Sequence, residues 1–340
     1  MPKSPADDDG VVTVFQHVGS VGAGEALAGS RGNYCMHGLA MSLTNAVPGM
    51  AHAVATILGG FEVDAFPPGF TAIDGRVEPY DVDSLTRRLP AGATRVPTPD
   101  DADDTFEIYQ EGERFWRVDE RWGICEVNLL KRTFRSYVLE SRLSHARRMD
   151  QAGNADLSTY ALAEAAVLWP ASQLMLAQGL HLVPATALAA DGWGVLLVGD
   201  QEITADLRQM IAGGFSLIGQ RWAALRAEDG LVAMLRMPAG EGCRVSHHAF
   251  CDHVVMINGF RREDTLLRPL AVHQATAALQ RIWPARHVRR TAAERQLVNR
   301  LAETCRVDQV TLGRNVCDLA HVINGIRPTR QERTAAVRAA

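Results

Sequence analysis

Hydrophobic residues recur along this chain with two different periods, and each period predicts a different kind of element. Over residues 105–130, aromatic and β-branched residues come in short runs separated by the polar segments Glu-Gly-Glu and Asp-Glu-Arg-Trp, which predicts an antiparallel meander. Residues 11–17 and 34–43 carry weaker runs of the same β type. Over residues 158–178 the apolar residues follow helical spacing in a segment rich in Ala and Leu. This predicts a helix that Pro170 kinks or divides.

The second half of the chain alternates apolar strands with amphipathic helices. Its strands are joined at two Asp-Gly pairs, at positions 191–192 and 229–230, which are turn signals between extended runs. Helices are predicted over residues 203–212, 270–283, 291–304 and 314–324, with further strands over 253–259 and 308–312. This alternation predicts an α/β fold for the second half, and the strand-rich start makes the whole chain α+β.

The length of the chain predicts two domains. A single hydrophobic core rarely grows beyond roughly 250 to 300 residues. This chain has 340 residues, of which 47% are hydrophobic. We expect a disordered start at 1–10, a small α+β N-terminal domain over 11–150, a second domain over 151–326 and a basic tail over 327–340.

The charge and the cysteines narrow the functional classes. The net charge is −4, with 35 basic and 39 acidic residues, so no overall field draws the protein to nucleic acid or to an anionic membrane surface. No apolar run approaches the ~18 to 20 residues that span a bilayer, and the first residues lack the features of a signal peptide. The six cysteines form no Cys-x-x-Cys pair, which is typical of reduced thiols. We therefore expect a cytoplasmic protein that binds neither nucleic acid nor membranes.

Four segments of the second half share a pattern with one known family. They are WPASQLMLAQGLHLVPATALAADGWGVLLVG (169–199), GGFSLIGQRWAAL (213–225), LRPLAVHQATAALQRIW (267–283) and VTLGRNVCDLAHVI (310–323). Through these segments residues 168–325 resemble the C-terminal domain of the HPr kinase/phosphorylase family and its related serine kinases. The resemblance implies a phosphoenolpyruvate-carboxykinase-like P-loop domain. It also implies a protein or peptide partner and a homo-oligomer.

The phosphate-binding loop of that family has lost its chemistry in this sequence. A P-loop uses glycines to bring backbone N–H groups to the phosphates, a lysine to reach them and a hydroxyl to hold Mg²⁺. Here Gly199 is followed by DQEITAD (200–206), and no lysine occurs after Lys131. Like charges ~4 Å apart cost about 1 kcal/mol even in water, so the carboxylates of this turn should repel ATP. We expect Gly199, Asp200 and Thr204 to be vestiges of a nucleotide site.

The acidic pair of the family is also missing. The two metal-binding aspartates fall at Gln220 and Arg221, and an amide and a guanidinium cannot replace them. A further family histidine is lost, although His181 matches an earlier one. We therefore expect a catalytically degenerate protein, a pseudokinase, that needs no cofactor. In it, Arg221 would neutralise Asp200 or Asp206 and hold the site shut.

Three alternatives lead elsewhere. In the first, the protein is an active ATP-dependent serine kinase whose rebuilt site uses Mg-ATP with His181, Thr204 and Asp206 as catalytic groups. In the second, the turn is an ordinary strand-to-helix connection in a protein unrelated to kinases. In the third, Zn²⁺ is bound within CRVSHHAFCDH (243–253), where thiolates and imidazoles are closely spaced. The candidate zinc ligands are Cys243, His247, Cys251 and His253.

Overall fold

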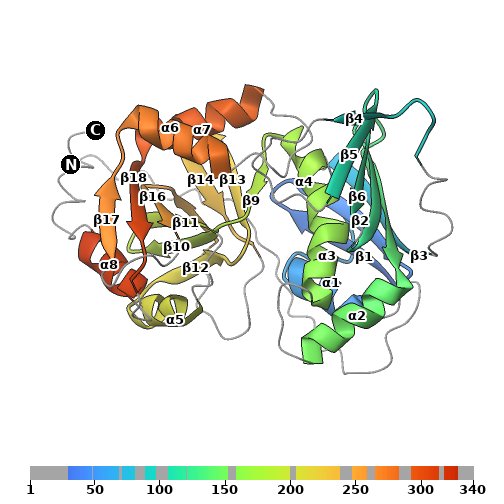
Figure 1. Ribbon diagram of the computed structural model, residues 1–340, viewed down its shortest axis with the longest axis horizontal. Helices are drawn as coiled ribbons and strands as arrows, with labels where there is room; N and C mark the ends of the chain where they lie inside the picture. The colour runs from blue at the N-terminus through green and yellow to red at the C-terminus, as the bar shows by residue number, and fades with distance from the viewer. Residues whose placement is uncertain are drawn as a thin grey trace, which may run out of the picture.

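The computed structural model describes most of the chain (Figure 1). The described residues are 30–47, 49–68, 71–80, 89–96, 106–119, 121–151, 158–199, 204–237, 247–258, 265–282, 292–313 and 318–327. The start at 1–10, the strand predicted at 11–17 and the tail beyond Arg327 lie outside these ranges.

An eight-stranded mixed sheet forms the first part of the molecule (Figure 1). Its strands are β1 (Ser30–Met36), β2 (Leu39–Asn45), β3 (Thr71–Tyr80), β4 (Thr94–Val96), β5 (Phe106–Glu111), β6 (Arg114–Asp119), β7 (Gly123–Asn128) and β8 (Thr133–Leu139). They are ordered β1-β2-β3-β8-β7-β6-β5-β4, with β2, β3 and β8 parallel. The consecutive antiparallel pairs from β5 to β8 confirm the meander predicted over 105–130.

Helices pack against this sheet and share its hydrophobic core. They are α1 (Ala51–Leu58), α2 (Glu140–Gln151), α3 (Thr159–Ala163), the π-helical turn η3 (Glu164–Leu168) and α4 (Trp169–Leu176). The core joins Leu43 and Phe134 of the sheet to Ile57 of α1 and Leu174 of α4. Among the described residues no helix is long and apolar enough to cross a membrane.

The helix predicted over 158–178 spans 159–176 and begins where the sequence indicated. The Ser158 hydroxyl accepts a hydrogen bond from the Ala161 N–H at 3.2 Å and caps the helix. The predicted division of this helix is found just before Pro170. The π-helical turn η3 separates α3 from α4, and Pro170 lies in the first turn of α4, where its missing N–H is tolerated.

The second part of the molecule contains two further sheets, so the class is mixed α/β, as expected. The six-stranded sheet has the order β12-β10-β11-β16-β18-β17, and the four-stranded sheet has the order β15-β14-β13-β9. The strands are β9 (His181–Val183), β10 (Thr186–Ala190), β11 (Trp193–Val198), β12 (Ser216–Gly219), β13 (Ala223–Glu228), β14 (Leu231–Leu235), β15 (His248–Phe250), β16 (His253–Asn258), β17 (Leu266–Pro269) and β18 (Arg306–Thr311). The helices are α5 (Thr204–Ala212), α6 (Val272–Ile282), α7 (Ala292–Thr304) and α8 (Asp318–Ile326). The predicted helices of this half are thus confirmed, with their ends shifted by a few residues.

The central strand β11 is buried on both faces. Val195 and Leu197 lie in a core covered by α5 and α8, whereas Leu196 and Val198 lie in a core shared with α6, α7 and the four-stranded sheet. Figure 1 shows the two pairs of helices on opposite sides of the six-stranded sheet. The uninterrupted apolar sequence of β11 follows from this position, because a parallel strand between two covering layers has no solvent face.

The two parts of the molecule meet at two hairpins. His37, between β1 and β2, donates from Nε2 to the Arg236 carbonyl oxygen at 2.6 Å, and the Arg226 guanidinium donates to the His37 carbonyl oxygen at 2.6 Å. Trp222 and Leu235 of the second part belong to the first core. The domain boundary expected after residue 150 stays a prediction, and the helices that follow it pack on the first sheet.

Gly194 of β11 lies against the backbone of β15. A Cβ at this position would be 1.9 Å from the Phe250 carbonyl oxygen and 2.6 Å from the Met234 methyl group. Gly194→Ala should therefore lower the free energy of unfolding by about 1–3 kcal/mol in urea denaturation, as overpacking does. Gly325→Ala, in α8, is the control: the added Cβ meets open space and Ala favours the helix, so this variant should lose no stability and should gain up to about 1 kcal/mol. Equal responses of the two variants would contradict the close approach of β11 and β15.

Candidate functional site

The predicted nucleotide site is a strand-to-helix turn at the end of β11. Gly199 follows the strand and α5 begins at Thr204, whereas residues 200–203, Asp200 included, lie outside the described ranges. Gly199 is required by packing, because a Cβ there would lie 2.5 Å from the Ile257 carbonyl oxygen of β16. This glycine therefore has a structural reason to be present even without a phosphate to bind.

Asp206, in the first turn of α5, is engaged in packing. It is 8% exposed, and its Oδ1 accepts a hydrogen bond from the Ala320 N–H at 2.9 Å. Ala320 is the third residue of α8, so this carboxylate satisfies one of the N–H groups that a helix start leaves open. The negative charge also suits the positive end of the α8 dipole. Asp206 thus ties α5 to α8, which favours a structural role over that of a catalytic base.

Gln220 and Arg221, which were expected to replace a metal-binding acidic pair, lie in the turn between β12 and β13. Arg221 adopts a φ of 64°, and its guanidinium lies 5.2 Å from the centre of the Tyr160 ring. Its NH2 group lies 3.4 Å from Glu164 Oε2. The expectation that Arg221 neutralises Asp206 is therefore corrected: the arginine faces the α3–η3 helix of the first part.

Glu164 is a residue that the sequence reasoning missed. It lies in the π-helical turn η3, and its Oε1 accepts a hydrogen bond from Trp222 Nε1 at 2.7 Å while Oε2 faces Arg221. Its side chain is 12% exposed. Glu164 thus connects the first part of the molecule to the β12–β13 turn. The available signal was a single acidic residue within an Ala-rich helix of otherwise apolar character.

His181 lies on β9, opposite Leu225 of β13, and is 3% exposed. Burial lowers the pKa of its imidazole to about 4, so the ring is neutral at physiological pH. The neighbouring Val183 and Leu225 belong to the core on the α6–α7 side of the six-stranded sheet, whereas α5 covers the opposite side. The three catalytic candidates of the active-kinase alternative are therefore not gathered into one place: His181 is separated from the α5 residues Thr204 and Asp206 by the sheet.

The candidate zinc ligands point to different surroundings. Cys243 lies outside the described ranges, and His247 is exposed. Cys251 belongs to the core beneath α6 and α7, whereas the His253 ring lies 5.8 Å from the ring of Trp193, in the core beneath α5 and α8. Where side chains are described, no group of three or more His, Cys, Asp or Glu residues is arranged to hold a metal ion. Zinc binding by this segment stays a prediction.

His253 instead takes part in a buried polar group with Asp308. Its Nε2 lies 2.7 Å from Asp308 Oδ2, and the Arg306 Nε donates to the same oxygen at 2.8 Å. Asp308 is 0% exposed. Burial lowers the pKa of His253, and the Asp308 carboxylate offsets part of this effect. The guanidinium of Arg306 supplies the positive charge that a buried carboxylate requires.

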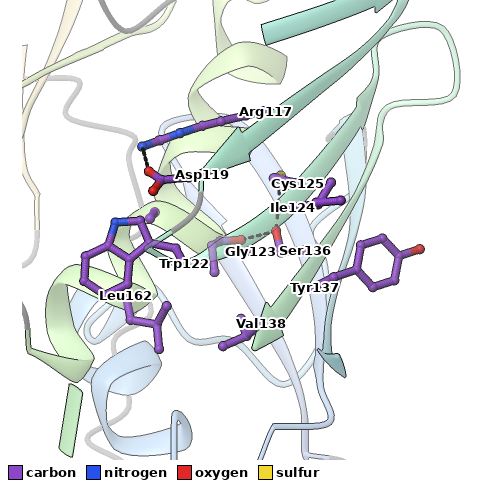
Figure 2. A pocket seen from close by; sticks show the side chains of 12 residues that line it. Arg117, Asp119, Trp122, Gly123, Ile124, Cys125, Ser136, Tyr137, Val138 and Leu162 are labelled. Carbon is purple, nitrogen blue, oxygen red and sulfur yellow. Dashed lines mark hydrogen bonds and ion pairs between the residues drawn. The ribbon is translucent and has the colours of Figure 1, made fainter. Parts of the chain in front are cut away.

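A hollow in the first part lies between strands β6 to β8 and the η3 turn (Figure 2). Its volume of about 20 Å³ has room for one water molecule. Arg117 and Asp119 form an ion pair at 3.0 Å on one side, and the Ser136 hydroxyl donates to the Ala166 carbonyl oxygen at 2.5 Å. Burial raises the pKa of the Cys125 thiol to about 12, which makes it a poor nucleophile. The hollow is too small for a substrate.

A second hollow, of about 300 Å³, lies between the β10–β11 turn and β15. It is lined by Ala and Gly residues together with Asp191, Ser216, His248 and Phe250. Two of these side chains contact other residues of this chain, since Asp191 pairs with Arg327 and His248 lies 3.8 Å from Glu228. The size suits a small molecule, but the lining indicates no particular chemistry.

The contact of Glu164 with Arg221 and Trp222 can be tested by mutation. Glu164→Ala removes the acceptor of both contacts and should lower the free energy of unfolding by about 1–3 kcal/mol. Arg221→Ala removes the partly exposed ion pair and the contact with the Tyr160 ring but leaves the Trp222–Glu164 hydrogen bond, and should cost about 1 kcal/mol. Urea denaturation of the single and double variants measures the coupling. Strictly additive effects would show that the two side chains do not interact.

Buried histidines should make the protein less stable in acid. Burial lowers the pKa of His37 and His181 to about 4, whereas the unfolded chain takes up these protons near pH 6.5. Above pH 6.5 these histidines therefore leave the free energy of unfolding unchanged. As the pH falls from 6.5 towards 4, each histidine lowers the free energy of unfolding by up to about 1.4 kcal/mol per pH unit. His181→Leu should flatten the pH dependence measured by urea denaturation. The exposed His273→Gln is the control, and an equal flattening in both variants would contradict the assignment to burial.

Comparison with known proteins gives a distant likeness among solved structures. No protein-family model matches the sequence, and no curated protein does. Among solved structures the chain is similar to the Hpr(Ser) kinase/phosphatase from Coxiella burnetii, with 12% sequence identity and a TM-score of 0.27. The alignment covers 46% of this chain and 98% of that one.

Proposed function

We propose that this protein is a catalytically degenerate, HPr-kinase-like protein that acts as a binding or regulatory partner of a protein- or peptide-modifying system. The proposal rests on the contacts of two residues at positions that, by resemblance, belong to the kinase site. The Asp206 carboxylate accepts a hydrogen bond from the Ala320 N–H, and Arg221 forms an ion pair with Glu164, so both side chains take part in packing. Phosphoryl transfer depends on acidic groups that are free to hold Mg²⁺ and to orient the nucleophile. In this protein Asp206 caps helix α8, and Gln220 and Arg221 stand in the place of the acidic pair.

The charges in the sequence support the same proposal. A P-loop neutralises the β- and γ-phosphates with a lysine, and this chain has no lysine after Lys131. The run at 200–206 contributes three carboxylates in its place. An anionic turn of this kind opposes the binding of triphosphate, and neither Mg-ATP nor Zn²⁺ is a required cofactor in the function proposed.

The proposed partner is based on the resemblance of residues 168–325 to the HPr kinase/phosphorylase family, a resemblance that implies a protein or peptide partner. A fold can keep its packing and serve recognition after its catalytic groups are lost. We therefore propose a protein or peptide partner, a homo-oligomeric assembly and a cytoplasmic location, with no role in binding nucleic acid or membranes. The net charge of −4 is consistent with the last point.

Thermal unfolding with Mg-ATP tests the loss of nucleotide binding. A ligand at 100 times its Kd adds about 2.7 kcal/mol of stability, so binding would raise Tm measurably. We expect no change of Tm with millimolar Mg-ATP, and no transfer of labelled γ-phosphate to the chain or to serine peptides. Asp206→Asn is the control, because Asn keeps an oxygen acceptor for Ala320. If the natural chain transfers phosphate and the Asp206→Asn variant does not, the protein is an active kinase and the proposal is wrong.

Purification from the native cell tests the binding role. The tagged chain, at its natural expression level, should be recovered with one specific protein or peptide in fixed proportion. The complex should also contain more than one copy of the chain by light scattering. Recovery as a lone monomer would contradict the proposed role.

A further inference from the structure

Two buried cysteines lie close together at the start of the central parallel strands. Cys251 lies two residues before β16, and Cys305 directly precedes β18 at the end of α7. They are 3% and 8% exposed, and both thiols are free. The Cys305 thiol donates to the Cys251 carbonyl oxygen at 3.0 Å, and the Cys251 thiol donates to the His253 carbonyl oxygen at 3.6 Å.

The strand register places the two cysteines next to each other at the start of neighbouring strands. In the parallel ladder His253 lies opposite Arg306, and the Arg306 N–H donates to the Asp252 carbonyl oxygen at 3.0 Å. Cys251 and Cys305 come just before these paired residues. Both belong to the core beneath α6 and α7, so they lie on the same side of the sheet. A disulfide requires the two side chains to point towards each other, which side chains on one side of two neighbouring strands can do.

We propose that Cys251 and Cys305 form a reversible dithiol–disulfide site that takes a peroxide as its oxidant. The Cys305 sulfur, the more exposed of the two, attacks one peroxide oxygen; an S–O bond forms, the O–O bond breaks, and hydroxide leaves as water after protonation. The Cys251 sulfur then attacks the sulfenic sulfur; the S–S bond forms and the S–O bond breaks, releasing a second water. Two thiols lose two electrons and two protons, and hydrogen peroxide becomes two molecules of water.

The other described cysteines have different surroundings. Cys125 is buried against Ser136, whose hydroxyl lies 3.2 Å from its sulfur. Cys35 lies partly buried on β1, in the first part of the molecule. The close approach of the Cys305 sulfur to the Cys251 backbone, with both side chains in one core, therefore distinguishes this pair from these two residues.

A disulfide at this position would join β16 and β18 and enclose α6 and α7 in a covalent loop. Cross-linking restricts the unfolded chain, so the oxidised form should unfold at a higher temperature than the reduced form. Thiol reductants would reverse the change. The site does not depend on the proposed function, because neither nucleotide nor partner takes part in the reaction.

Peptide mapping after oxidation tests the site. The reduced full chain, freed of reductant, is treated with hydrogen peroxide, alkylated in denaturant, digested and examined by mass spectrometry. We expect a linked peptide pair that contains Cys251 and Cys305, about 2 Da lighter than the two reduced peptides together and separated by a thiol reductant. The Tm should rise by several degrees on oxidation and return on reduction.

Variants separate this site from the other cysteines. Cys305→Ala should abolish both the linked peptide and the rise in Tm, whereas Cys125→Ala should retain both. Mapping of the natural chain and of Cys125→Ala decides the matter even if Cys305→Ala does not fold. The proposal is overturned if Cys251 and Cys305 are both still alkylated under conditions that oxidise Cys35, or if each is oxidised separately without a link.

Discussion

The burial of β11, β16 and β18 on both faces is the constraint on which the rest of the structure depends. A parallel sheet with two apolar faces must be covered on each side, here by α5 with α8 and by α6 with α7 and the four-stranded sheet. Any polar group in these layers must then find a partner within the protein. Asp252 receives the Gly194 N–H at 2.8 Å, and His253 is held by Asp308, both at the start of β16.

The same requirement explains the partners of two buried carboxylates. A carboxylate removed from water is costly unless it is paired or hydrogen-bonded. Asp206 meets this need by capping α8, and Glu164 meets it by accepting from Trp222 and facing Arg221. Both side chains thereby contribute to cohesion between elements.

The fold was easier to predict than the site. Strand and helix positions follow from local periodicity, and the meander over 105–130 and the helices of the second half were found in this way. The contact of Arg221 with Glu164 was not anticipated, because Glu164 lies 57 residues earlier and only the packing of η3 against the β12–β13 turn brings the two together.

The sequence by itself determined the mixed α/β class, the apolar central strands and the absence of a lysine from the turn, because composition and periodicity are properties of neighbouring residues. The tertiary structure alone decided which polar groups meet: the Asp206 carboxylate with the Ala320 N–H, 114 residues later, and the Cys305 thiol with the Cys251 carbonyl oxygen, 54 residues apart. Contacts at such separations depend on strand order and on the layer that each helix covers. A local sequence pattern encodes neither the strand order nor the layer that a helix covers. Only the folded chain therefore shows which polar groups bind each other within the core.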